Sequence, residues 1–336
     1  MHNRLITPPS LHKGDTIALI TPATVVKEEF VGGAERYLHL RGYRTVRMPG
    51  FTTGGDGSFA SSAAVRASDL ITAIYNPDIK AIWCGRGGYG SVQIIGKIPL
   101  SVIRENPKWL IGFSDISALH ALFHRAGVVS LHAPMLRRLN NSLLSSMGNS
   151  GATCPPAEFD GALSADYPLD SLFHIMEGGG SLEYDLGRHP LCIDGVACGP
   201  LLGGNLAVLS DLSATPFDML SAAEAKTSQP VIFLEDIAES ISRVERRLWR
   251  LRLAGVLNNA SAILFGRFTA YEPNANSRDM ESMISALMQE WNIDVPVAYN
   301  CPVGHDDFNL PFPIGASASV EITPFSATLT LNLKKE

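Results

Sequence analysis

Hydrophobic and polar residues alternate along the first half of the chain in the pattern of strands separated by helices. Short apolar runs predict strands over residues 16–21, 43–48, 81–84, 109–113 and 128–132. Apolar positions at helical spacing predict helices over residues 28–40, 62–75 and 115–125. Strands that alternate with helices in this order predict a parallel sheet with helices on both faces.

The second half combines helices with strands of antiparallel character. It begins near Cys192, and Gly203–Leu206 is expected to open a helix. Further strands are predicted over residues 231–234, 262–265, 296–300, 317–322 and 327–333, and further helices over 241–254 and 277–291. The last two strands alternate apolar and polar residues with a period of two, which is typical of antiparallel pairs. This half is therefore expected to be a mixed α/β domain.

Residues 140–170 separate the two halves and are rich in Ser, Asn, Gly, Ala and Pro. Such a composition without periodicity predicts a surface excursion or an interdomain connection. A short helix is expected over 169–176. We place the domain boundary in this region, with an N-terminal α/β domain at residues 1–165 and a C-terminal domain at residues 166–336.

Composition narrows the class of protein. With 336 residues, 46% of them hydrophobic, the chain can bury a large core in about two domains. A formal net charge of -6 and a pI of about 5.9, without a basic stripe, argue against nucleic acid as a partner. The chain has no signal-peptide pattern and no apolar run long enough to span a membrane, so we expect a cytoplasmic protein. Its five cysteines form no CxxC pair, and we expect no metal and no cofactor.

The segment Trp109–His120 predicts a site of chemistry. Its apolar run leads through Gly112 and Phe113 into Ser114, and a helical pattern follows at once. A serine on such a turn lies at the C-terminal edge of a sheet, beside the backbone N–H groups of the following helix. Ile116 stands where the common GxSxG motif has its second glycine. We expect Ser114 to be a nucleophile on a different turn.

A nucleophilic serine needs a base, and three kinds of position offer a histidine. His120 and His124 lie on the helix after Ser114 and are expected to serve packing or the surface. His132 ends a neighbouring strand and is a real competitor. His305 lies in an irregular loop after a strand, where catalytic residues are common, and we favour it as the base.

The base in turn needs an acid that orients it. Glu235 directly follows the apolar run 231–234 and is the best placed. Asp236 fits better as an acid near a helix N-terminus. Asp306 and Asp307 are alternatives, although residues so close to His305 in the chain rarely point back at its ring.

The loop Gly85–Gly90 has four glycines among six residues, so its N–H groups can approach a ligand closely. One of them, from Gly87 or Gly88, is expected to join the N–H of Asp115 in an oxyanion hole. The GxGxxG spacing and a P-loop lysine are both missing, which argues against a flavin- or nucleotide-binding domain. Arg86 can hold a substrate carboxylate or make a surface ion pair, and the sequence leaves both open.

Together these motifs resemble the LD-carboxypeptidases, a family of serine peptidases that includes the microcin C immunity peptidases. The resemblance covers most of the chain. The matching motifs are Leu11–Ala18, Cys84–Gly90, Gly112–Ile116, Gly203–Leu206, Leu234–Glu239 and Pro302–His305. The chain departs from the family pattern at Ser117, at Ala133 and over 241–246. None of these positions is one of the three candidate catalytic residues.

The resemblance implies a flavodoxin-like N-terminal domain with a parallel sheet and a swivelling C-terminal α/β domain with antiparallel strands. It implies a triad of Ser114, Glu235 and His305 between them, an oxyanion hole from the glycine loop and the Asp115 amide, and a homodimer. Gly204 and Asn205 join Arg86 as expected substrate contacts.

We therefore expect a serine carboxypeptidase that releases the terminal D-alanine from cytoplasmic murein tetrapeptides by cutting an L,D amide bond. Two alternatives remain open. One is a microcin-immunity-type peptidase that cuts peptidyl-nucleotides. The other is a non-catalytic protein that binds murein peptides, which predicts a degraded triad, whereas all three residues are present here.

Overall fold

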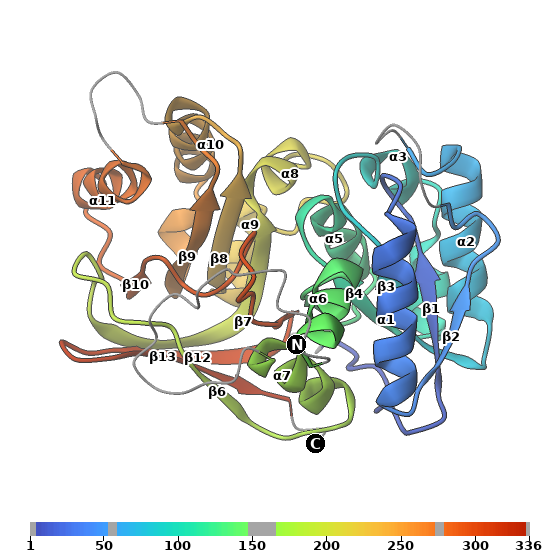
Figure 1. Cartoon of the computed structure of the whole chain (residues 1–336). Coiled ribbons are helices and arrows are strands. Elements are labelled where there is room, and N and C mark those ends of the chain that lie inside the picture. Colours follow the sequence, from blue (N-terminus) through green and yellow to red (C-terminus); the bar gives the residue numbers. More distant parts are fainter. Residues whose placement is uncertain (1–4, 53–58, 147–165, 273–278, 334–336) are drawn as a thin grey trace. The chain divides into compact units, whose positions relative to one another are not determined.

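The chain divides into two compact units. The computed structural model describes residues 5–52, 59–146, 166–272 and 279–333 (Figure 1). The N-terminal unit comprises Asn3–Gly179 together with Leu310–Pro313, and the C-terminal unit comprises Gly180–Asn309 together with Ile314–Lys334. None of the helices in the described ranges is both long enough and apolar enough to cross a membrane.

The N-terminal unit is built on a sheet of six strands in the order β11-β5-β4-β3-β1-β2. These strands are β1 Thr16–Ile20, β2 Arg44–Arg47, β3 Ile79–Cys84, β4 Trp109–Gly112, β5 Ser130–His132 and β11 Phe312–Ile314. Strands β1 to β5 pair in parallel, which confirms the predicted sheet. Their order is flavodoxin-like, with its switch point between β1 and β3. Loops at the carboxyl ends of these strands are therefore the expected place for a ligand.

The helices of this unit confirm and extend the sequence prediction. They are α1 Glu28–Leu40, α2 Ala63–Tyr75, α3 Val92–Ile95, α4 Leu100–Glu105, η1 Ser114–Ile116, α5 Ser117–Arg125, α6 Leu136–Ser146 and α7 Tyr167–Met176. Ser62 caps α2 by accepting a hydrogen bond from the Val65 N–H. Helix α6 corrects the expectation of irregular chain from 140 onward, because it continues to Ser146 and packs on α1. The remainder of the predicted excursion, 147–165, lies outside the described residues.

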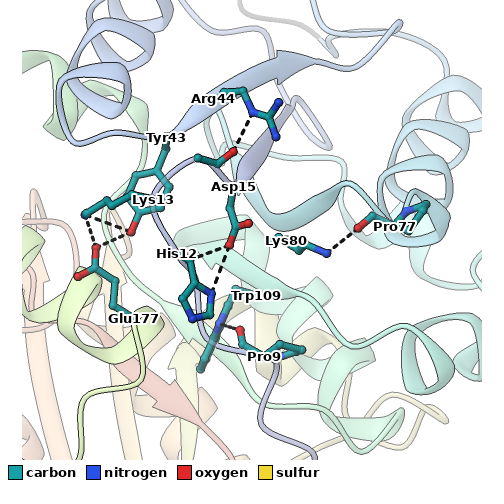
Figure 2. A network of polar contacts seen from close by, with 11 residues as sticks. Pro9, His12, Lys13, Asp15, Tyr43, Arg44, Pro77, Lys80, Trp109 and Glu177 are labelled. Atoms are coloured by element: carbon teal, nitrogen blue, oxygen red, sulfur yellow. Dashed lines mark hydrogen bonds and ion pairs between the residues drawn. The ribbon is translucent and has the colours of Figure 1, made fainter.

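Helix α7 belongs to the N-terminal unit, whereas the sequence-based division after residue 165 assigned it to the second domain. Aromatic contacts and the polar contacts seen in Figure 2 hold it there. The Lys13 Nζ donates to the Glu177 carboxylate over 2.6 Å, and the Tyr43 hydroxyl donates to the same oxygen. The Tyr43 ring stacks on Phe173, with centroids 5.6 Å apart. These contacts join residues more than a hundred positions apart, which local composition cannot reveal.

The C-terminal unit has a seven-stranded sheet in the order β10-β9-β8-β7-β12-β13-β6. Its strands are β6 Leu182–Asp185, β7 Gly195–Asn205, β8 Val231–Ile237, β9 Ala262–Thr269, β10 Val297–Ala298, β12 Ser317–Ile322 and β13 Ala327–Asn332. The helices are α8 Leu206–Asp211, α9 Ala222–Ser228, α10 Ile241–Leu253, η2 Leu257–Asn259 and α11 Met280–Glu290. The mixed α/β prediction is confirmed.

Strand β7 joins the two halves of this sheet. Its first part pairs with β12 in the antiparallel sense, and its last part, Leu201–Asn205, pairs with β8 in parallel. Glycines at 195, 199, 203 and 204 and a proline at 200 concealed this strand in the sequence, because both residue types are unusual inside strands. The last residue of β7, Asn205, thus pairs with Glu235, which lies two residues before the end of β8.

Candidate active site

Ser114 has a strained backbone. The buried strand β4 ends at Gly112, and Ser114 follows with a φ of 65°. For a residue with a side chain this left-handed conformation costs about 1–3 kcal/mol, and it persists only where its surroundings hold it. The Ile116 N–H donates to the Phe113 carbonyl over 3.3 Å and closes the turn. The predicted strand–turn–helix is confirmed, with a 3₁₀ turn before α5.

His120 supports this turn from behind. Its Nε2 lies 2.9 Å from the Gly112 carbonyl oxygen, and its Nδ1 lies 2.9 Å from the Ser130 Oγ. A carbonyl can only accept, so Nε2 carries the proton and Nδ1 accepts from the serine hydroxyl. Complete burial lowers the pKa of His120 to about 3, which keeps the ring neutral. His120 is therefore a packing residue, as its place on the helix predicted.

The glycine loop after β3 lies directly against Ser114. A Cβ atom on Gly87 would stand 2.9 Å from the Ser114 Cβ and 3.3 Å from the Asp115 backbone nitrogen. Any side chain at this position would therefore collide with the serine. The Thr24 hydroxyl donates to the Gly87 carbonyl over 2.7 Å. Because the peptide unit is planar and trans, this contact turns the Gly88 N–H to the side opposite Thr24.

Two buried charged residues hold the glycine loop in place. The Asp115 carboxylate accepts from the Ser91 N–H over 2.8 Å. The Arg66 guanidinium donates to the carbonyls of Gly90 and Pro22, at 2.9 and 2.6 Å. Burial lowers the pKa of Arg66, and the charge of Asp115 opposes that shift. Arg66 was not among the residues predicted for the site, although helical spacing places it on the buried face of α2.

In the C-terminal unit, Glu235 and His305 form a close pair. The Glu235 side chain is wholly buried at the end of β8, and its Oε2 lies 2.7 Å from the His305 Nδ1. A carboxylate at Nδ1 fixes the proton there, so that Nε2 is the ring nitrogen that can take up another. Gly304, with a φ of 126°, makes the approach possible, since a Cβ there would stand 3.0 Å from the Glu235 Cβ.

The neighbouring carboxylates have other partners. Asp236 accepts from the Asn205 Nδ2 over 2.9 Å and from the Ala207 N–H over 3.0 Å, at the start of α8. Burial, and next the charge of Glu235, raise the pKa of Asp236 to about 6. Asp306 pairs with Arg267 over 2.9 Å, which corrects its suggested role as the acid that orients His305.

The three expected substrate contacts differ in their surroundings. Arg86 is exposed and makes no hydrogen bond or ion pair with the residues that the structure describes. Gly204 is the next-to-last residue of β7, has a φ of 142° and pairs with Leu234. The Asn205 side chain caps α8 at the Val208 N–H and also binds Asp236. Their contact with a substrate stays a prediction.

The candidate residues thus form two groups. Ser114, Asp115 and Gly87 lie together in the N-terminal unit, and Glu235 lies with His305 in the C-terminal unit. Their union in one triad stays a prediction. His132, the competing base, lies in the same unit as Ser114 and is wholly buried, with its ring 5.8 Å from that of Phe113. Within the described ranges no cluster of three or more His, Cys, Asp or Glu residues could hold a metal ion.

Comparison with known proteins bears on both units. The family model described as the LD-carboxypeptidase N-terminal domain matches residues 17–133, and that of the LD-carboxypeptidase C-terminal domain matches residues 198–320. A murein tetrapeptide carboxypeptidase from Pseudomonas aeruginosa is 29% identical, over 91% of this chain and 92% of that protein. The microcin C7 self-immunity protein MccF from Escherichia coli is 25% identical, over 98% of this chain and 96% of its own length.

The fold is also that of a solved structure. The muramoyltetrapeptide carboxypeptidase from Oxalobacter formigenes superposes with a TM-score of 0.74 at 24% identity. The match covers 94% of this chain and 98% of the other. At this identity the likeness establishes the architecture alone.

Proposed function

This chain belongs to the LD-carboxypeptidase family of serine peptidases, and from that premise we propose that Ser114, His305 and Glu235 form its catalytic triad. The observation that carries the proposal is the Glu235–His305 pair, a histidine held at Nδ1 by a fully buried carboxylate over 2.7 Å. The strained backbone of Ser114 supports it, because strain of this kind gathers at functional sites.

In the proposed reaction, the Ser114 hydroxyl attacks the carbonyl carbon of the scissile amide. His305 takes the hydroxyl proton at Nε2 and then gives it to the leaving amine, while Glu235 stabilises the imidazolium that forms between these steps. Water cleaves the resulting acyl-enzyme with His305 again as the base. The terminal D-alanine thus leaves in the first step, and the second step releases the shortened peptide with a new carboxylate and returns the proton to Ser114.

The oxyanion of the tetrahedral intermediate would be held by two backbone donors. The first is the Asp115 N–H, which follows the nucleophile directly. The sequence left Gly87 and Gly88 as equal candidates for the second. The contact of Thr24 with the Gly87 carbonyl favours Gly88, since it turns the Gly88 N–H away from Thr24.

We propose a murein tetrapeptide as substrate, with release of its terminal D-alanine during recycling of wall peptides in the cytoplasm by a homodimer. The named relative from P. aeruginosa supports this choice of substrate. Arg86, exposed beside the glycine loop, is the proposed clamp for the terminal carboxylate, and Gly204 and Asn205 are proposed as further contacts. Replacement Arg86→Ala should raise KM for the tetrapeptide and leave KM for its C-terminal amide unchanged.

A microcin-immunity-type peptidase is the second candidate, favoured by the relative named for microcin C7 immunity. The two can be separated by incubating the protein with a murein tetrapeptide and with a microcin-like peptidyl-nucleotide, and by identifying the products by mass spectrometry. Loss of one D-alanine from the tetrapeptide supports the first proposal. Cleavage of the peptidyl-nucleotide alone supports the second, and no cleavage of either would contradict both.

A further inference from the structure

Helix α10 carries four arginines in one stripe. Arg243, Arg246, Arg247 and Arg250 recur at spacings of three and four, so their side chains share a face of the helix. The buried residues Ile241, Val244, Leu248 and Leu251 form its opposite face. Like charges at this spacing repel one another, which destabilises a helix unless an opposite charge is near. This stripe corrects the sequence-based expectation that the chain has no basic stripe, which rested on the net charge of -6 for the whole chain.

A cavity lies between this stripe and helix α8. Its volume is about 280 Å³, and it is lined by Ser210, Asp211, Arg243, Arg246, Arg247 and Arg250. Ser210 is 1% exposed, and its hydroxyl has no hydrogen-bond partner among the described residues. A buried hydroxyl without a partner is unfavourable. The cavity is thus lined by a residue with an unsatisfied hydroxyl and by an excess of positive charge.

The charge of the cluster is only partly neutralised. Glu239 lies 3.0 Å from the Arg247 guanidinium and 3.5 Å from that of Arg243. Arg246 and Arg250 form no ion pair with any residue in the described part of the chain. Two guanidinium groups at the cavity therefore lack a fixed counter-charge.

We propose that this cavity is a binding site for a small phosphate ester. Planar guanidinium groups bind phosphate oxygens in a bidentate manner, and Arg246 and Arg250 are free to do so. The Ser210 hydroxyl donates a third hydrogen bond. A cavity near 300 Å³ takes a small molecule and is larger than a single phosphate needs. Asp211 accepts hydrogen bonds from hydroxyl groups on the organic part of the ligand.

Isothermal calorimetry at physiological ionic strength tests this site, with ribose 5-phosphate, inorganic phosphate, citrate and ribose as probes. Ribose 5-phosphate should bind with a Kd below about 1 mM, inorganic phosphate more weakly, and ribose not at all. Equal binding of citrate would overturn the assignment to phosphate. Binding only at tens of millimolar or higher is what non-specific screening of the arginines by any anion would give. That result would contradict the proposal that the cavity is a binding site.

Two double variants test whether ribose 5-phosphate binds at this cavity. Arg246→Ala/Arg250→Ala should weaken ribose 5-phosphate at least about tenfold, because two charge-assisted contacts are lost. A matched control, Arg36→Ala/Lys226→Ala, removes two exposed positive charges elsewhere and should leave the Kd within about twofold. Equal weakening in both pairs would contradict the proposal.

Ser210→Ala separates binding from a structural role. Its hydroxyl has no hydrogen bond to lose in the folded protein, so the variant should unfold at the same temperature or higher. It should nevertheless bind ribose 5-phosphate several-fold more weakly. Unchanged affinity in this folded variant would remove Ser210 from the site. Binding is measured without turnover, so these results do not depend on whether Ser114 is the nucleophile.

Discussion

The two units hold their parts of the candidate site by different means. Around Ser114 the backbone itself is constrained, by a left-handed φ of 65°, a glycine with no room for a side chain and a buried histidine bound to the preceding strand. Around His305 a hydrogen bond of 2.7 Å between side chains links the imidazole to a buried carboxylate. The nucleophile should therefore be sensitive to changes of shape, and the base to changes of charge.

The largest effect should come from the nucleophile. Ser114→Ala removes the attacking oxygen and should lower kcat by about 10⁶, as when the serine of a triad is deleted. The release of D-alanine from a murein tetrapeptide, followed by mass spectrometry, measures this loss.

A second variant at the same position tests the backbone argument. Glycine adopts a positive φ without steric cost, so Ser114→Gly should be equally inactive but more stable than Ser114→Ala, by up to about 1 kcal/mol. Thermal unfolding of the two variants compares them directly. If Ser114→Gly were the less stable of the two, the turn would carry no strain.

On the side of the base, Glu235→Gln should lower kcat by about 10⁴ with little change in KM. The amide keeps the shape of the side chain but no longer holds the His305 proton at Nδ1, and loss of this tautomer has such a cost in a triad. Asp236→Asn, one residue further along β8, is the matched control and should retain far more activity, because Asp236 binds Asn205 and α8 instead. Equal losses in both variants would contradict the assignment of the acid.

The sequence predicted the candidate catalytic residues better than it predicted the residues that hold them in place. Ser114 and His305 come after strands and Glu235 lies near the end of one, and strands with continuous apolar runs are readable from one sequence. Arg66 and Thr24 escaped notice, because their role depends on carbonyl groups that a sequence does not locate. Strand β7 was hidden by its glycines, and α7 was assigned to the wrong unit because its partners are distant in the chain.

The stability of the two units should depend on pH in different ways, and this effect should be smaller than those on activity. His120 stays neutral through the neutral range, whereas Asp236 is a buried acid whose pKa is raised from 3.8 to about 6. The folded state binds this proton more tightly than the unfolded chain. Its stabilising contribution is therefore complete below pH 4 and is lost as the pH rises through 6, by at most about 3 kcal/mol.

Asp236→Asn should remove this pH dependence. Thermal unfolding from pH 4 to pH 7 should show the wild type losing stability relative to the variant across that window. In Glu235→Gln the loss of stability should be smaller than in the wild type and should be complete at a lower pH. The neighbouring charge that helps to raise the pKa of Asp236 is gone in this variant. Parallel curves for the wild type and Asp236→Asn would show that Asp236 does not titrate there.

The smallest effect should come from the support of the glycine loop. Thr24→Val keeps the shape of the side chain but removes the hydroxyl that binds the Gly87 carbonyl over 2.7 Å. The peptide that presents the Gly88 N–H is then less firmly oriented, and kcat should fall about tenfold, or about 1.4 kcal/mol of barrier. Thr24→Ser retains the hydroxyl and should stay close to the wild type. If both variants keep full activity, the Gly88 N–H is not an oxyanion donor. If Thr24→Ser alone loses activity, the threonine methyl and not its hydroxyl holds the loop, and the shape of the packing would then govern this half of the site.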